Sequence, residues 1–213
     1  MDANHGAPHV AVWAMSLCPD AHAFVLSQLK PAVAALGPAG LRVKMEFFGA
    51  VDRHVPSGFA APHGQGEVYL NEVELCVQRL FPKHLQWLDF VVCMSEPFEV
   101  SVHLSSLLVT SVESLPVHHG QGQLHERIRE CGTNFALSKL LHCANGTEGA
   151  LLFAESIEEG RQRDPRASPT VDIDGSMWCG QNANVAISCQ HGNFTHELCS
   201  RWPSPRPRAC GSG

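Results

Sequence analysis

Residues 9–20 read His-Val-Ala-Val-Trp-Ala-Met-Ser-Leu-Cys-Pro-Asp. The first seven are largely apolar or β-branched and lack a helical period, so they predict a buried strand. Pro19 suits the first position of a helix, where the N–H that proline lacks would be unpaired anyway. Free N–H groups and the helix dipole at that point stabilise a thiolate at Cys18, although the like charge of Asp20 opposes this. We therefore expect Cys18 to be an exposed, reactive thiol rather than a small buried apolar side chain.

The segments that follow continue an α/β pattern. Residues 21–36 have near-helical spacing, and Pro31 inside them predicts a kink or an end. Residues 41–48 alternate as a half-buried strand does. Two strands separated by a helix predict a parallel pair. Further helices are expected over residues 67–88, 135–143 and 147–160, with 87–94 as a short apolar run, and loops over 50–66 and 118–122.

A second feature lies far along the chain, in residues 168–175, Ser-Pro-Thr-Val-Asp-Ile-Asp-Gly. Four alternating residues predict a strand, and Asp-Gly predicts a hairpin turn after it. In thioredoxin-like folds a cis-proline before a strand faces the reactive cysteine. We expect Pro169 to be that cis-proline and, with Ser168, to dock the substrate. The alternative is an ordinary trans proline at the start of a strand.

The composition excludes several classes of protein. The chain has 213 residues, 44% of them hydrophobic, which suits one domain with additions. Its formal charge of −6 and the lack of a basic stripe argue against nucleic acid as a partner. No run of 18 apolar residues predicts a membrane span, and we expect no cofactor. Protonation of the 13 histidines would reverse the sign of the charge in an acidic compartment; the alternative interpretation of their number is that many are simply solvated surface groups.

The nine cysteines are the strongest compositional signal. An odd number allows four bridges and one free thiol. Bridges require an oxidising compartment, and sequons at Asn145 and Asn193 agree with a secretory route. We expect a secreted or lysosomal glycoprotein, the alternative being a cytosolic protein with reduced thiols. Residues 1–8 are polar and lack the apolar core of a signal peptide, so we expect a mature chain whose leader has been removed.

From residue 179 onward hydrophobic residues thin out and cysteines cluster. We expect a flexible N-terminal remnant over residues 1–8, a thioredoxin-like domain over 9–178 with a helical insertion at about 67–160, and a disulfide-rich tail over 179–213. The tail cysteines Cys179, Cys189, Cys199 and Cys210 allow three pairings. The alternative interpretation of the tail is a zinc site, although the tail lacks a compact Cys-x-x-Cys pair. Such a site would use Cys179, Cys189, His191, His196 and Cys199.

An ordered set of motifs resembles the gamma-interferon-inducible lysosomal thiol reductase (GILT) family. The motifs are residues 16–20 and 28–31, His63-Gly64, Asn71, Cys76, and residues 92–96, 143–152 and 169–175. The resemblance implies a thioredoxin-like core with inserted helices, and reduction of protein disulfides in acidic endocytic compartments or outside the cell. It carries the catalytic role to Cys18 and implies structural bridges Cys76–Cys93 and Cys131–Cys143.

The chain also departs from the family pattern. Many members have a second cysteine where this chain has Ala21. The signature Cys-Gln-His-Gly followed by three residues and a cysteine maps onto residues 61–68, where Ala61 and Val68 replace both cysteines. Such a paired loss is what the removal of one disulfide would leave. A second Cys-Gln-His-Gly at residues 189–192 reads as a chance repeat, and residues 100–123 read as an insertion.

Two functions follow from a single reactive cysteine. In the first, Cys18 attacks a protein disulfide, and a small thiol, cysteine or glutathione, releases the product. Without such a thiol, one of the tail cysteines would have to reach the site. In the second, the chain is a binding or effector protein on a retired reductase scaffold, as Ala21 and the lost cysteine pair suggest.

Overall fold

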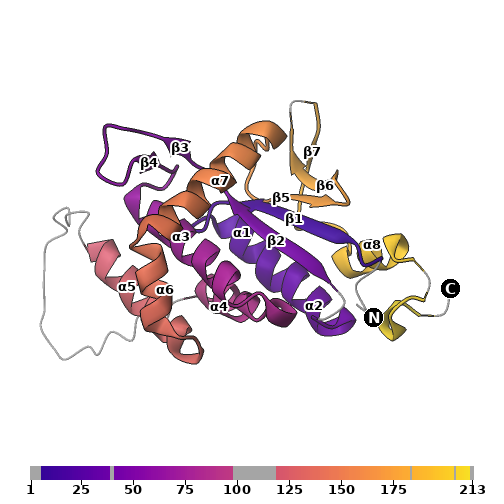
Figure 1. The fold of residues 1–213 in the computed structure, drawn as a ribbon. Helices are drawn as coiled ribbons and strands as arrows, with labels where there is room; N and C mark the ends of the chain where they lie inside the picture. The colour runs from indigo at the N-terminus through magenta and orange to yellow at the C-terminus, as the bar shows by residue number, and fades with distance from the viewer. Residues whose placement is uncertain (1–5, 39–40, 98–118, 183, 204, 212–213) are drawn as a thin grey trace, which may run out of the picture.

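A five-stranded mixed sheet forms the centre of the molecule (Figure 1). The structure, a computed structural model, describes residues 6–38, 41–97, 119–182, 184–203 and 205–211. The strand order is β2-β1-β5-β6-β7, and β1 is parallel to β2 while the other pairs are antiparallel. The strands are β1 (His9–Ala14), β2 (Arg42–Phe47), β5 (Thr170–Ile173), β6 (Ser176–Gln181) and β7 (Ala186–Ile187), with a separate hairpin of β3 (Ala50–Val51) and β4 (Phe59–Ala60). The predicted parallel pair and the Asp-Gly hairpin are confirmed.

The first helical segment stays helical through Pro31. It consists of α1 (Pro19–Phe24), a π-helical stretch η1 (Val25–Leu29) and α2 (Lys30–Leu36). The predicted end at Pro31 is wrong, because the chain stays helical past it; a π-helical stretch comes just before Pro31, which falls in the first turn of α2. A proline there removes an N–H that the wider turn need not pair.

The helical insertion lies between β4 and β5, and its helices pack on one another, with α3 and α7 against β2 (Figure 1). It comprises α3 (Gln65–Leu80), η2 (Lys83–Leu85), α4 (Trp87–Ser95), α5 (His119–Cys131), η3 (Gly132–Asn134), α6 (Leu137–Ala144) and α7 (Thr147–Arg163). The predicted helix over 67–88 is broken by positive φ values at His84 and Leu85. The apolar run after it is itself a helix, α4.

The loop expected over residues 118–122 is also corrected, because α5 begins at His119. Two glycines weaken a helix there by about 1 kcal/mol each, but tertiary packing overrides propensity. Ile128 and Cys131, later in α5, are buried and anchor it to the core. Most of the expected insertion over residues 100–123 lies outside the described residues.

Four disulfides join eight of the nine cysteines: Cys76–Cys143, Cys93–Cys131, Cys179–Cys189 and Cys199–Cys210. The first two correct the pairing that the family resemblance implied. Their cause is helix packing, since α3 lies against α6 and α4 against α5. The Cα atoms of these pairs are 6.0 and 5.6 Å apart, within the span of a disulfide.

The tail folds back on the first helical segment. Phe194, at the start of α8 (Phe194–Arg201), packs edge-to-face against Phe24 and at a tilt against Trp178, with ring centroids 5.4 and 5.0 Å apart. Gln28 receives the Phe194 N–H at 3.2 Å and donates to the Gly192 carbonyl at 3.3 Å. The tail ends in η4 (Arg208–Cys210). The zinc alternative is wrong, because the three cysteines it needs are bound in disulfides, and the described residues hold no other group of metal-binding side chains.

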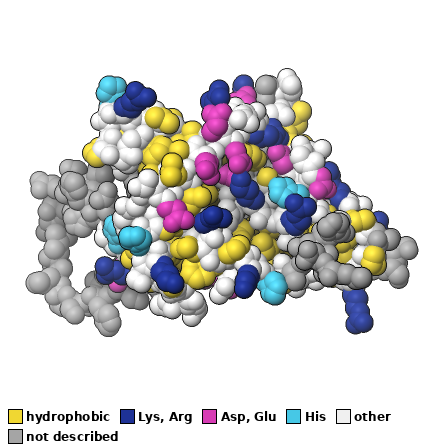
Figure 2. All heavy atoms as spheres, viewed as in Figure 1, with side chains coloured by type: hydrophobic (Ala, Val, Ile, Leu, Met, Phe, Trp, Pro, Cys, Tyr) yellow, Lys and Arg dark blue, Asp and Glu magenta, His cyan; other side chains and the backbone are white. Residues whose placement is uncertain are grey.

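The outer surface carries mixed charge. Figure 2 shows basic and acidic side chains interspersed on one face rather than gathered into a patch of one sign. Among the described helices, none combines the length and apolar character needed to cross a bilayer.

Candidate active site

Cys18 stands at the junction between the central strand and the first helix. It is the N-cap residue of α1, and Pro19 takes the first helical position. Its N–H donates to the Met15 carbonyl at 3.0 Å, and its carbonyl accepts the His22 N–H at 3.1 Å. The N-cap position places the cysteine beside the N–H groups that the first helical turn leaves unpaired.

The cis-proline loop, which leads into the neighbouring strand β5, lies against the thiol. The Ser168–Pro169 peptide bond is cis, as predicted. The Cys18 thiol donates to the Ser168 carbonyl at 3.4 Å, and the Ser168 hydroxyl accepts the Met15 N–H at 2.8 Å. The chain thus brings together Cys18, Ser168 and Pro169, which the sequence placed about 150 residues apart.

Cys18 is buried, and its residue is only 8% exposed. The expectation of an exposed cysteine is therefore wrong, since the cis-proline loop lies directly against the sulfur. Ala21, on the same turn, is buried as well and presents only a methyl group. Cys18 is the one free thiol, and all nine cysteines lie in the described part of the chain.

The first turns of α3 hold the loop that precedes Cys18. The Leu17 N–H donates to Glu67 Oε1 at 3.2 Å, and the Ser16 N–H donates to Asn71 Oδ1 at 3.4 Å. Glu67 is fully buried and also accepts the backbone N–H of His63 at 3.1 Å, while the His63 ring lies 2.8 Å from Oε1. Glu67 is thus a positioning residue for the loop.

The sequence interpretation missed Glu67. The signal that could have found it is its place in residues 61–68, the stretch that matches the family at His63-Gly64 and lacks its two cysteines. His63 and Asn71, noted there as matching motifs, prove to be its partners or neighbours in the same clamp.

Further acidic side chains on α3 are buried close by. Burial raises the pKa of Glu72 to about 7. Burial, and then the charge of Glu67, raises the pKa of Glu74 well above its usual range. Both groups hold their protons more firmly in the folded protein than in the unfolded chain.

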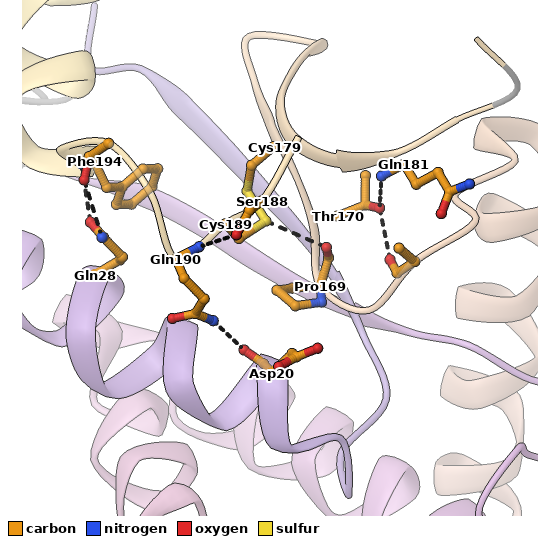
Figure 3. The surroundings of a disulfide bond; sticks show 12 residues. Asp20, Gln28, Pro169, Thr170, Cys179, Gln181, Ser188, Cys189, Gln190 and Phe194 are labelled. Carbon is orange, nitrogen blue, oxygen red and sulfur yellow. Dashed lines mark hydrogen bonds between the residues drawn. A yellow bond between two sulfur atoms is a disulfide. The ribbon is translucent and has the colours of Figure 1, made fainter. Parts of the chain in front are cut away.

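A cavity of about 320 Å³ adjoins the cis-proline loop. Asp20, Ser168 and Pro169 line one side of it, and residues 186–190 of the tail line the other. Gln190 spans the two sides by donating from Nε2 to the Asp20 carbonyl at 3.1 Å (Figure 3). Two larger cavities, of about 420 and 480 Å³, contact neither residues 15–20 nor residues 167–169.

Both sequon asparagines are exposed. Asn193 caps α8 with its Oδ1, which accepts the His196 N–H at 2.9 Å. Asn145 donates one Nδ2 hydrogen to the Leu141 carbonyl at 2.8 Å. A glycan would replace a single Nδ2 hydrogen, so neither contact has to be lost.

The sheet, the cis-proline and the inserted helices define a thioredoxin-like fold, as predicted. Solved structures with this fold include a putative protein-disulfide isomerase from Pseudomonas syringae, with TM-score 0.55 and 15% identity over 93% of this chain and 95% of that one. Another is DsbA from Mycobacterium tuberculosis, with TM-score 0.52 and 14% identity over 91% of this chain and 80% of that one.

Within that class the chain is GILT-like. Residues 9–107 match the model of the family described as gamma interferon inducible lysosomal thiol reductase (GILT). The chain is also 25% identical to GILT-like protein 1 of Drosophila melanogaster over 212 residues, which cover 94% of this chain and 77% of that protein. The resemblance predicted from the sequence motifs is confirmed, and it supports a thiol oxidoreductase in general.

Proposed function

We propose that the protein reduces protein disulfides through the single nucleophile Cys18, with an external small thiol completing the turnover. One observation carries the proposal. The free thiol lies at the N-terminus of α1 and directly against the cis-proline loop, 3.4 Å from the Ser168 carbonyl.

The reaction takes three exchanges. The Cys18 thiolate attacks one sulfur of a substrate disulfide, and the other substrate sulfur leaves as a thiolate and takes up a proton. A thiolate of cysteine or glutathione then attacks the Cys18 sulfur and releases the second substrate thiol, and a second small thiol attacks the resulting mixed disulfide, so that Cys18 is a thiol again and two small thiols have become one small-molecule disulfide. Ala21 supplies no thiol for this second exchange, so an external thiol is required.

The substrate docks at the cis-proline loop. Ser168 and Pro169 line the cavity beside Cys18, and the Ser168 carbonyl already accepts the Cys18 thiol. When the thiol ionises it ceases to donate, and this carbonyl becomes free to accept a backbone N–H from an extended substrate segment.

The protein works in a secreted or lysosomal setting and carries glycans at Asn145 and Asn193. The four disulfides favour an oxidising compartment, and both asparagines are exposed.

The test is an insulin reduction assay with glutathione or cysteine, at about pH 5 and at neutral pH. Cys18→Ser should lose at least about a hundredfold in rate, because serine is a far weaker nucleophile. Ser27→Ala, on the exposed side of the same helical segment, is the matched control and should keep the wild-type rate. Equal rates for wild type and Cys18→Ser would sink the proposal.

Burial favours a second candidate, a binding or effector protein that no longer turns over. Cys18 is only 8% exposed and its thiol is engaged by Ser168, so a large substrate disulfide must displace that contact. This candidate predicts no insulin reduction with any small thiol and a partner that binds Cys18→Ser as well as wild type. Measurable turnover that depends on Cys18 rules it out.

A further inference from the structure

The Cys179–Cys189 disulfide lies beside the site of Cys18. Cys189 Sγ approaches the Pro169 carbonyl oxygen to 3.4 Å (Figure 3), and Cys18 Sγ lies 3.4 Å from the carbonyl oxygen of Ser168. Consecutive carbonyl oxygens of one chain lie no more than about 5 Å apart, so the two sulfurs are within about 12 Å of each other. One cis-proline loop thus separates the free thiol from a disulfide.

The segment that carries Cys189 is lightly held. β7 has two residues and pairs only with Gly180 and Gln181. Val185 and Ile187 are each 45% exposed, so little apolar surface fixes this strand to the core. Segments with few buried apolar contacts open locally at low free-energy cost. A movement confined to residues 184–190 would bring Cys189 toward Cys18.

The same segment already reaches the helix of Cys18. Gln190, next to Cys189, bonds to the carbonyl of Asp20, two residues after Cys18. The cavity of about 320 Å³ is lined by Cys189 as well as by Asp20, Ser168 and Pro169. A small thiol that entered this cavity would meet Cys189, although the disulfide is otherwise buried.

We infer that Cys179 and Cys189 form the resolving dithiol of this protein, which completes the exchange that Cys18 begins. The inference rests on the proposed reductase function and deepens it. In this scheme the dithiol supplies the second thiol that Ala21 does not provide. The external thiol then reduces the Cys179–Cys189 disulfide instead of the mixed disulfide with substrate.

The electrons balance over three steps. With Cys179 and Cys189 reduced, the Cys189 thiolate attacks Cys18 Sγ in the mixed disulfide; the bond from Cys18 to the substrate sulfur breaks, and the substrate thiolate takes up the proton that Cys189 released. Cys179 then attacks Cys189 Sγ, and Cys18 leaves as a thiol. Two molecules of a monothiol such as glutathione reduce Cys179–Cys189 again and become one glutathione disulfide.

The first test traps the contact between the two sulfurs. Cys179→Ala leaves Cys189 unpaired, with only the cis-proline loop between it and Cys18. After oxidative refolding, peptide mapping without reduction should find Cys18 linked to Cys189, with the loss of both alkylation adducts. Cys210→Ala leaves Cys199 unpaired in the same tail and is the matched control; it should keep two alkylated thiols. Alkylation of both Cys18 and Cys189 in a variant whose circular dichroism matches wild type overturns the inference.

A second measurement uses the wild-type chain, so that it decides the question if Cys179→Ala fails to fold. The protein is equilibrated in a series of glutathione redox buffers, quenched with acid and mapped. A Cys18–Cys189 linked peptide at some buffer ratio supports the inference. Its absence at every ratio overturns it.

The turnover assay separates this inference from the proposed function. Replacing both Cys179 and Cys189 with Ala should slow insulin reduction by glutathione about tenfold, while replacing Cys199 and Cys210 should not. If only Cys18→Ser lowers the rate, the reductase function stands and the resolving role is wrong. If Cys18→Ser changes nothing, the reductase function itself fails, whatever the trap shows.

Discussion

Glu67→Gln tests whether the buried carboxylate on α3 holds the loop that leads into Cys18. Glu67 accepts two backbone N–H groups, from Leu17 and His63, and also contacts the His63 ring. An amide of the same size keeps one acceptor oxygen and turns an NH₂ group toward a partly buried donor. The substitution therefore leaves one backbone N–H without an acceptor and weakens the bonds that remain.

The magnitude follows from these contacts. A partly buried N–H without a partner costs about 1–3 kcal/mol, and loss of the charge from the remaining bonds costs about 1 kcal/mol more. We expect the free energy of unfolding to fall by about 2–4 kcal/mol and the melting temperature by about 5–12 °C. Insulin reduction should fall about tenfold, because a displacement of the Leu17 loop shifts the nucleophile.

Urea denaturation followed by tryptophan fluorescence measures the change in stability. Glu148→Gln is the matched control, since Glu148 lies in the first turn of α7, as Glu67 does in α3, and is exposed. Glu148→Gln removes the same favourable interaction of a carboxylate with a helix N-terminus, but it breaks no hydrogen bond like those of Glu67. A loss for Glu67→Gln within about 0.5 kcal/mol of that control would refute the clamp.

Three further changes probe the site. Ala21→Cys should form a disulfide with Cys18 and remove the free thiol from mass-spectrometric counting, whereas Ala23→Cys should add one free thiol. Glu72 holds a proton up to about pH 7 in the folded protein and up to about pH 4.5 in the unfolded chain. The free energy of unfolding is therefore greatest below about pH 4.5 and falls as the pH rises through about 7. Glu72→Gln should remove about 1 kcal/mol of this fall in urea titrations, after allowance for partial solvation. Gly180→Ala would place a methyl carbon 2.5 Å from the Thr170 Cα, and should lower stability by about 2–4 kcal/mol more than Gly175→Ala, which also has positive φ but open space around it.

Local signals in the sequence were sufficient to predict the elements at the centre of the fold. The strand, Cys-Pro and helix around Cys18 each follow from residues close in the chain, and so does the hairpin after Pro169. The cis peptide bond was expected from its place before a strand, by analogy with one fold class. These features depend on backbone propensity and pattern, which a single sequence carries.

The predictions that were wrong or missing concern contacts between segments that lie far apart in the sequence. The pairing of Cys76 with Cys143 is decided by which helices pack together, and spacing along the chain does not reveal it. The burial of Cys18 comes from Ser168, on a loop far along the chain. Glu67 escaped notice because its partners are mostly backbone N–H groups, which leave no pattern in a sequence.

The central claim is that Cys18 Sγ is the atom that attacks the substrate disulfide. Acid-quenched mixtures of wild-type protein and insulin, digested without reduction and examined by mass spectrometry, test it most directly. The account predicts a peptide in which Cys18 is joined to an insulin cysteine, and its absence in Cys18→Ser. Insulin reduction that proceeds with the mixed disulfide on any other cysteine, while Cys18 stays free throughout, would contradict it.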